Sequence, residues 1–155
     1  AAGAAEGINL VTMISALRDL KIPPGRMRLI EGASGTLIID DSYNGNPRGV
    51  HEAIQTLNRF TKRRKIYLTP GLVEMGARAE TVHEHIGKEL STVADLVILI
   101  KNTVTPFIAT GLKKNKFEKN NIMWFNSAKK AHKALGTILK PNDVILFQND
   151  WTDNY

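Results

Sequence analysis

The sequence contains no cysteine and no long apolar run. The first absence excludes disulfide bonds and thiolate chemistry, and it is compatible with a reducing compartment. The second excludes a transmembrane helix, which needs about 20 consecutive apolar residues. The small, weakly polar start AAGAAEG also lacks the basic region of a signal peptide. We therefore predict a cytoplasmic protein that does not associate with membranes.

Three common enzyme motifs are also missing. The sequence has no G-x-x-x-x-G-K-[ST] loop for phosphate, no G-x-G-x-x-G dinucleotide fingerprint and no G-x-S-x-G nucleophile elbow. The stretch GLVEMGAR (71–78) has two glycines at the spacing of the first motif, but Ala77 and Arg78 replace its lysine and hydroxyl residue. The chain therefore has no phosphate-gripping loop of its own.

Positive charge is plentiful by comparison. The formal net charge is +6, and basic residues gather at 62–65, 113–119 and 129–133. A basic surface can bind nucleic acid. No recognition motif or ladder of aromatic residues accompanies these clusters, so we favour solvated helix ends and loops and predict no nucleic-acid partner. A positive surface would still attract anionic nucleotides.

The apolar residues of this 155-residue chain are spaced as in one α/β domain. A first helix over 8–20 carries Val11, Ile14, Leu17 and Leu20 on one face, and the prolines of KIPPG (21–25) break it. Strands over 27–32 and 35–40 are close enough to pair antiparallel. Helices and strands then alternate: we predict helices from 47, over 78–93, over 104–114 and from 128, and strands over 65–69, 95–100, 121–125 and 143–147.

Strands that recur about every 20–30 residues with helices between them indicate βαβ units. We predict a Rossmann-like α/β fold: an open, mostly parallel six-stranded sheet with helices on both faces and one antiparallel strand near the N-terminus. In such sheets ligands bind beyond the carboxyl ends of the strands. The polar residues at these ends are therefore the candidate site.

The stretch IIDDSYNGNP (38–47) closes the first strand of the parallel series. A carboxylate at Asp41 can accept hydrogen bonds from vicinal hydroxyls such as those of a ribose, and Asn44 can both donate to and accept from an adenine edge. Asn46, which precedes a proline, is a good N-cap and would turn a helix N-terminus toward the crevice. The same residues also suit a simple turn and cap. Tyr43 could pack on the sheet end or stack on a base.

A second polar group follows the strand at 65–69. Gly71, after a proline, permits close approach of a ligand or of backbone. Glu74 either lies beside the crevice or is an exposed loop carboxylate. His83 and His85 face different sides of their helix, which is a poor spacing for a shared metal ion, so we predict no metal site. For either histidine we favour a satisfied side chain over a ligand.

Four stretches resemble the C-terminal domain of the Mur ligases in their order and intervals: PPGRMRLI (23–30), IIDDSYNGNP (38–47), TPGLVEMG (69–76) and HEHIG (83–87). The resemblance runs from about Pro23 to Phe147. It implies a domain division in which residues 23–155 form that C-terminal domain. Residues 1–22 resemble the last helix of the family's central ATPase domain.

The resemblance implies one part of a three-domain, ATP-dependent acid–amino-acid ligase of peptidoglycan precursor synthesis. In that family the central domain carries the phosphate loop and Mg²⁺, and the N-terminal domain binds the UDP-sugar. ATP activates a carboxylate of the UDP-N-acetylmuramoyl-peptide as an acyl phosphate, which an amine attacks. The C-terminal domain closes over the ATP, excludes water and helps to position the incoming amino acid or D-alanyl-D-alanine dipeptide. The domain alone is expected to be inactive and to contain no catalytic residue.

The same resemblance assigns ATP-binding roles to Arg26, Asp41, Tyr43, Asn44 and Asn46. Arg26 would reach the phosphate or ribose, since a guanidinium can grip phosphate oxygens bidentately. Asp41 would hold the ribose hydroxyls, and the other three would line the adenine and ribose side.

Near the substrate cleft the resemblance places Gly71, Glu74 and His83. The chain departs from the family in this area: TPGL (69–72) stands where Leu-Gly-Asp-Met is common, and QNDW (148–151) stands where Lys-Gly-Ser-Arg is common. These departures leave open a related ligase with another amine substrate. The sequence is also compatible with a stand-alone nucleotide-binding module or subunit, and with a folate-polyglutamylating or cyanophycin-type ligase. The Ser-Tyr-Asn-x-Asn-Pro block favours the Mur branch over a ligase of the folate or cyanophycin type.

Overall fold

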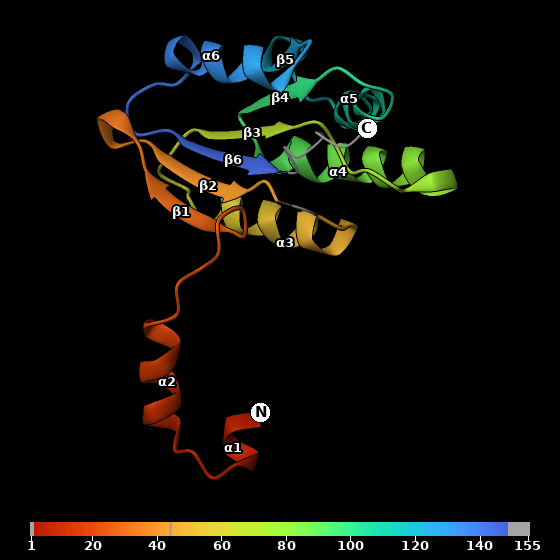
Figure 1. Cartoon of the computed structure of the whole chain (residues 1–155). Coiled ribbons are helices and arrows are strands. Elements are labelled where there is room, and N and C mark those ends of the chain that lie inside the picture. The colour runs from red at the N-terminus through yellow and green to blue at the C-terminus, as the bar shows by residue number, and fades with distance from the viewer. Residues whose placement is uncertain (1, 44, 149–155) are drawn as a thin grey trace.

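Six strands form one mixed sheet, and helices pack on both of its faces (Figure 1). The computed structural model describes residues 2–43 and 45–148. The strands are β1 (Arg28–Glu31), β2 (Leu37–Asp41), β3 (Lys65–Thr69), β4 (Leu96–Ile100), β5 (Ile122–Phe125) and β6 (Val144–Gln148). Their order is β1-β2-β6-β3-β4-β5, with β1 antiparallel to β2 and every other neighbouring pair parallel. This topology confirms the predicted fold class.

The main helices divide unequally between the two faces of the sheet (Figure 1). Three of them contribute to one apolar core: α3 (Pro47–Asn58), α4 (Ala79–Val93) and α5 (Thr105–Lys114). The fourth, α6 (Ala128–Ile138), packs on the other face. The connections from β2 to β5 run in one direction across the sheet, whereas the connection from β5 returns to place β6 between β2 and β3. Because such crossovers are right-handed, the returning helix lies on the opposite face.

Alternation along the strands supplies both cores. Tyr67 of β3 belongs to the three-helix side, and its neighbours Ile66 and Leu68 belong to the α6 side. All five residues of β4 are buried, as its continuous apolar sequence predicts. The predicted inward residues Val50, Ile54 and Leu57 of α3, and Ile86 and Leu90 of α4, are buried too. These helices are therefore held mainly by burial of one apolar stripe.

Helices α4 and α5 approach each other at two glycines. A Cβ at Gly87 would lie 2.1 Å from the carbonyl oxygen of Ile108, and a Cβ at Gly111 would lie 2.1 Å from the carbonyl oxygen of Glu84. No side chain fits at such a distance, so the two backbones are in direct contact. Helix α5 is thereby held directly against α4.

The N-terminal segment lies apart from the sheet (Figure 1). It forms a short helix that was not predicted, α1 (Ala2–Ala5), and α2 (Leu10–Arg18), which is shorter than the expected 8–20 because the Asn9 side chain caps it by accepting from the Thr12 N–H. No residue of α2 is buried, and most of its apolar side chains are exposed, with Val11 at 77% and Leu17 at 64%. Within the described residues, no helix has the length and apolar character needed to cross a membrane.

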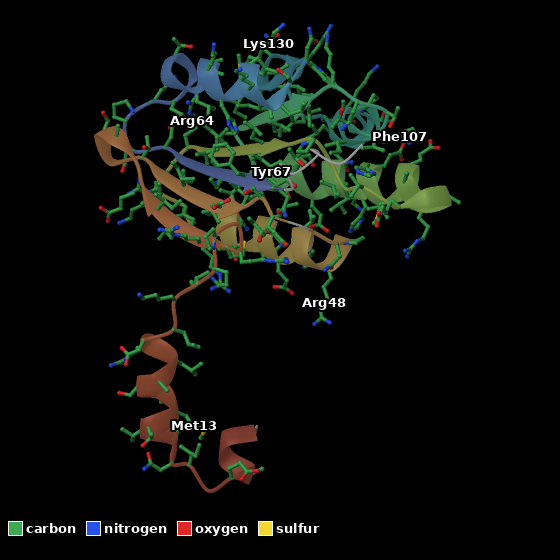
Figure 2. The ribbon with its side chains drawn as sticks, viewed as in Figure 1. Met13, Arg48, Arg64, Tyr67, Phe107 and Lys130 are labelled. Carbon is green, nitrogen blue, oxygen red and sulfur yellow. The ribbon has the colours of Figure 1, made fainter. Side chains whose placement is uncertain are left out.

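The amino ends of the strands are joined by a charged network, and Figure 2 shows Arg64 at that end of the sheet. The Arg64 guanidinium donates to both carboxylate oxygens of Asp143, at 3.1 and 2.6 Å, and to the carbonyl oxygen of Ile138 at 2.8 Å. Asp143 is only 2% exposed. Arg63 donates to two loop carbonyls. Half of the basic cluster at 62–65 therefore stabilises the fold.

Candidate functional site

Two segments that flank β1 and β2 meet at the carboxyl edge of the sheet. The N–H of Gly25 donates to Oδ2 of Asp40 at 3.0 Å, and the N–H of Met27 donates to Oδ1 of Asp41 at 3.2 Å. The N–H of Tyr43 donates back to the carbonyl of Gly25 at 3.2 Å. Gly25 has φ +69°, and a Cβ there would lie 2.7 Å from the Cβ of Tyr43, so this contact requires glycine. The stretches PPGRMRLI (23–30) and IIDDSYNGNP (38–47) are thus joined to each other at this edge.

The side chains of Arg26 and Tyr43 stack at the surface of this structure. The guanidinium carbon of Arg26 lies 4.6 Å from the centre of the Tyr43 ring, within the range of a cation–π interaction. Tyr43 is 57% exposed. The Tyr43 ring therefore does not pack on the end of the sheet, which was one of the two interpretations of this residue. The pair therefore places a fixed positive charge over one face of an exposed aromatic ring.

Asp41 is held between the first segment and the last strand. Its Oδ2 accepts a hydrogen bond of 2.7 Å from Nε2 of Gln148, the residue opposite it in β6. Burial raises the pKa of Asp41, while the hydrogen bonds from Gln148 and Met27 and the charge of Arg26 act in the opposite direction. A carboxylate has about four acceptor positions. Each of the two Asp41 oxygens uses one acceptor position for these contacts, so the carboxylate can accept further hydrogen bonds.

Asp40 differs from its neighbour in what it contacts. Its Oδ1 accepts 2.6 Å from the Ser42 hydroxyl, and its Oδ2 is used by Gly25. Asp40 therefore closes the local turn, whereas Asp41 faces the last strand.

Gln148 was not predicted as a site residue. It is 1% exposed, and among the described residues its Oε1 has no hydrogen-bond partner. Buried polar atoms are normally satisfied, so an unsatisfied acceptor at a strand end is notable. Its position at the carboxyl end of β6 is the signal that could have found it. The rest of the predicted departure, residues 149–151, lies outside the described residues.

Asn46 caps α3, as predicted. Its Oδ1 accepts from the Gly49 N–H at 3.0 Å, and Pro47 occupies the first turn. Figure 2 shows Arg48, in the same turn, extending away from the body of the domain. Asn44 lies outside the described residues.

A hollow lies beyond the carboxyl ends of β3 and β4. It has a volume of about 390 Å³ and lies between the loop 70–76 and the turn 102–104. Its walls are mostly apolar, and Glu74 is the only charged residue among the described residues that line it. Glu74 has φ +60°, a conformation that non-glycine residues seldom adopt. The predicted cleft residue Glu74 therefore lies in a pocket, on a loop with an unusual backbone.

Gly71 and His83, the other two predicted cleft residues, are not among the residues that line this pocket. His83 is fully buried; its Nε2 accepts from the N–H of Leu72 at 2.9 Å, and its Nδ1 is 2.6 Å from the carbonyl oxygen of Ala79. Burial lowers the pKa of His83, against the effect of these two backbone hydrogen bonds. The ring is therefore a satisfied, neutral histidine, which is the interpretation favoured from the sequence.

Two other histidines contact one carboxylate. Glu89 of α4 is 2.9 Å from Nδ1 of His51 on α3 and 2.8 Å from Nε2 of His85, which lies one turn earlier in α4. Across residues 2–43 and 45–148, no group of three or more His, Cys, Asp or Glu side chains could hold a metal ion.

The structure is an α/β domain with polar residues at the carboxyl ends of its strands, and comparison with known proteins assigns its family. Residues 25–148 match the family described as Mur ligase, glutamate ligase domain. The chain belongs to this family. It is 32% identical over 149 residues to the UDP-N-acetylmuramoyl-tripeptide–D-alanyl-D-alanine ligase of Bacillus subtilis (strain 168), covering 96% of this chain and 32% of that protein. The chain thus spans about a third of the length of the curated relatives it matches.

Solved structures show the same fold. The MurF ligase of Thermotoga maritima in complex with ADP superposes with a TM-score of 0.69 at 26% identity, over 90% of this chain and 33% of that chain. The MurF of Acinetobacter baumannii superposes with a TM-score of 0.76 at 21% identity, over 96% of this chain and 32% of that chain. The resemblance seen in the sequence motifs is confirmed at the level of family and fold.

Proposed function

We propose that this chain is the C-terminal domain of an ATP-dependent Mur-type ligase that acts in peptidoglycan precursor synthesis in the cytoplasm. The joined segments 25–27 and 40–43 at the carboxyl edge, within a chain of this family, carry the proposal. On this proposal residues 1–22 are the end of a central ATPase domain, and residues 23–155 are the C-terminal domain. The exposed apolar side chains of α2 support this division, because they would be covered by the rest of that central domain.

The carboxyl edge has groups that fit ATP. The carboxylate of Asp41 would accept hydrogen bonds from the ribose hydroxyls, and the Tyr43 ring, with Asn44 and Asn46, would line the adenine and ribose side. Arg26 would bind a phosphate or ribose oxygen. ATP would supply the phosphoryl group that activates the carboxylate of a UDP-N-acetylmuramoyl-peptide.

We assign Mg²⁺ mainly to the central domain, which would also carry the phosphate loop that this sequence lacks. The role of the present chain is closure over the ATP. Closure would exclude water from the activated carboxylate and fix the geometry of attack by the amine. The UDP-sugar would be held by an N-terminal domain of the same enzyme. The chain alone would therefore be inactive.

The pocket beside Glu74 is the proposed cleft for the amine substrate. Its mostly apolar walls suit the two methyl groups of a small acceptor such as D-alanyl-D-alanine. That dipeptide is a zwitterion, and Glu74 would supply a carboxylate for its ammonium group. Gly71 and His83 would shape the cleft from behind rather than contact the substrate.

A second candidate is a related ligase that joins another amine. The observation that favours it is the sequence Pro70-Gly71-Leu72, where an acidic residue common in the family is missing. The ATP side is the same in both candidates, so they differ only in the acceptor.

A ligation assay tests the proposal. The complete polypeptide that carries this sequence is incubated with ATP, UDP-N-acetylmuramoyl-tripeptide and D-alanyl-D-alanine, and phosphate and amide product are measured. We expect phosphate release to require all three substrates, and we expect none from the 155-residue chain by itself. Turnover by the isolated chain would refute the domain assignment. Ligation of another amino acid in preference to the dipeptide would support the second candidate.

A further inference from the structure

The loop Pro70–Leu72 forms one wall of the pocket, and each of its three residues is fixed by a different side chain. The Pro70 carbonyl accepts a hydrogen bond of 2.5 Å from Nδ2 of Asn102. The Gly71 N–H donates to Oγ1 of Thr69 at 2.8 Å, and the Leu72 N–H donates to Nε2 of His83 at 2.9 Å. Pro70, Gly71 and Leu72 are all buried, so their backbone groups need partners within the protein. Side chains supply these partners, and they tie three consecutive residues to the body of the domain.

Each of the two distant side chains is itself oriented by a helix. The Nδ1 of His83 lies 2.6 Å from the carbonyl of Ala79, one turn earlier in α4, so Nδ1 carries the proton and Nε2 is the acceptor for Leu72. The Oδ1 of Asn102 accepts from the N–H groups of Val104 and Thr105 at 3.0 Å each, at the start of α5. This leaves the Nδ2 group to donate to the loop.

The loop is also packed tightly against these groups. Gly71 has φ +86°, and a Cβ there would lie 2.8 Å from Cγ2 of Val104 and 2.9 Å from Nε2 of His83. Since α4 and α5 are in backbone contact through Gly87 and Gly111, the two anchor points are fixed relative to each other. The position of the pocket wall therefore follows from the helix pair.

We propose that His83 and Asn102 are positioning residues for the ligation reaction, and that they set the wall against which the amine acceptor binds. This inference rests on the proposed function. The ATP side is built on β2, and β6 separates β2 from β3 and its loop. Loss of either anchor should therefore raise KM for the acceptor and leave KM for ATP unchanged.

Two substitutions at His83 separate its two ring nitrogens. In His83→Gln the side-chain oxygen can take the place of Nε2 and accept from Leu72, whereas in His83→Asn the amide reaches only the place of Nδ1. We expect His83→Asn to raise the acceptor KM about 10-fold, the scale of one lost hydrogen bond. We expect the acceptor KM of His83→Gln to stay within about threefold of the wild-type value and KM for ATP to stay within about twofold in both.

Asn102→Asp supplies a second test if His83→Asn does not fold. It keeps the oxygen that caps α5 but replaces the donor to Pro70 with an acceptor. We expect it to raise the acceptor KM by about the same 10-fold factor. An acceptor KM unchanged in every variant that folds would overturn the inference.

Amide hydrogen exchange on the 155-residue chain distinguishes this inference from the proposed function. We expect the Leu72 amide to exchange about 10-fold faster in His83→Asn than in wild type or His83→Gln, because its acceptor is lost. Unchanged exchange would overturn the inference even if the complete polypeptide ligates. If Leu72 exchange rises while the wild-type polypeptide ligates no amine, the proposed function fails and the anchoring stands.

Discussion

The two edges of the sheet use charged residues in different ways. At the amino edge, Arg64 and Asp143 satisfy each other in a two-pronged pair, and the carboxylate is almost fully buried. At the carboxyl edge, Asp41 shares its contacts among an amide, a backbone N–H and a neighbouring guanidinium, and the nearby Tyr43 ring is exposed. One edge is closed within the domain, and the other retains groups that a ligand could use.

Unusual backbone does not separate the two edges. Met27 and Glu74 have positive φ in loops of the carboxyl edge, and Ser34 and Asn142 have positive φ in loops of the amino edge. The comparison teaches that neither charge nor an unusual backbone conformation alone marks a site in this domain. What distinguishes the carboxyl edge is its polar groups with remaining hydrogen-bonding capacity.

The largest effect on stability is expected at the amino edge, where Arg64 and Asp143 form their pair. Arg64→Met leaves the buried carboxylate of Asp143 without its cation and should lower the free energy of unfolding by about 3 kcal/mol. Urea unfolding of the chain measures it. The matched control is Lys62→Met, at an exposed position of the same basic cluster, which should change stability by about 0.5 kcal/mol or less. An Arg64→Met variant as stable as the control would contradict the stabilising role assigned to the pair of Arg64 and Asp143.

Asp41→Asn should weaken ATP binding at the carboxyl edge without unfolding the domain. In the complete polypeptide we expect KM for ATP to rise about tenfold, because a charged acceptor for the ribose is lost.

Asp41→Asn is expected to weaken ATP binding, but it should not lower the free energy of unfolding. The folded state holds the Asp41 proton more tightly than the unfolded chain, since its pKa is raised above 3.8. The ionised carboxylate therefore costs stability above this pKa, and that cost disappears as the pH falls below 3.8. Asp41→Asn should equal or slightly exceed wild type in urea unfolding at pH 7. A destabilised variant with unchanged KM for ATP would contradict the assignment.

The buried His83 predicts an acid-sensitive contribution to stability. Its folded-state pKa lies below 6.5, so the unfolded chain binds the proton more readily. The contribution of His83 is therefore fully present above pH 6.5 and is lost as the pH falls toward and through the folded pKa. Unfolding measured from pH 8 to 5 should show this slope in wild type and a shallower one in His83→Gln. Identical slopes would show that His83 is not the group responsible.

The smallest effect is expected at Tyr43. Tyr43→Leu removes the ring under Arg26, and exposed cation–π pairs contribute about 0.5–1 kcal/mol. KM for ATP in the complete polypeptide should rise about threefold. Tyr43→Phe keeps the ring and should match wild type. Equal KM values for Leu and Phe would show that the aromatic face does not contribute.

Much of the fold was predictable because the signals are local. The cap at Asn46 was recognised from residue type and position, and the structure confirms it. The buried strand β4 was equally clear from its unbroken apolar run. The strand order was not predicted, because insertion of β6 between β2 and β3 depends on which apolar faces meet.

The site was predicted only in part, because only some of its residues belong to a local sequence pattern. Asp41 and Tyr43 stand in a recognisable motif at a strand end. Gln148 and Asn102 act through partners far away in the sequence, and no local pattern marks such contacts. For Asn102 a weak signal existed, because an asparagine side chain in a turn often accepts from backbone N–H groups two and three residues later.

The most direct test of the account compares the two edges in one measurement. Hydrogen–deuterium exchange is recorded for the complete polypeptide with and without a non-hydrolysable ATP analogue and the UDP-N-acetylmuramoyl-peptide. We predict that peptides spanning 24–28 and 40–46 become protected, while those spanning 62–65 and 140–143 do not change. Protection confined to the amino edge, or equal at both edges, would contradict the claim that the carboxyl edge is where this domain closes over ATP.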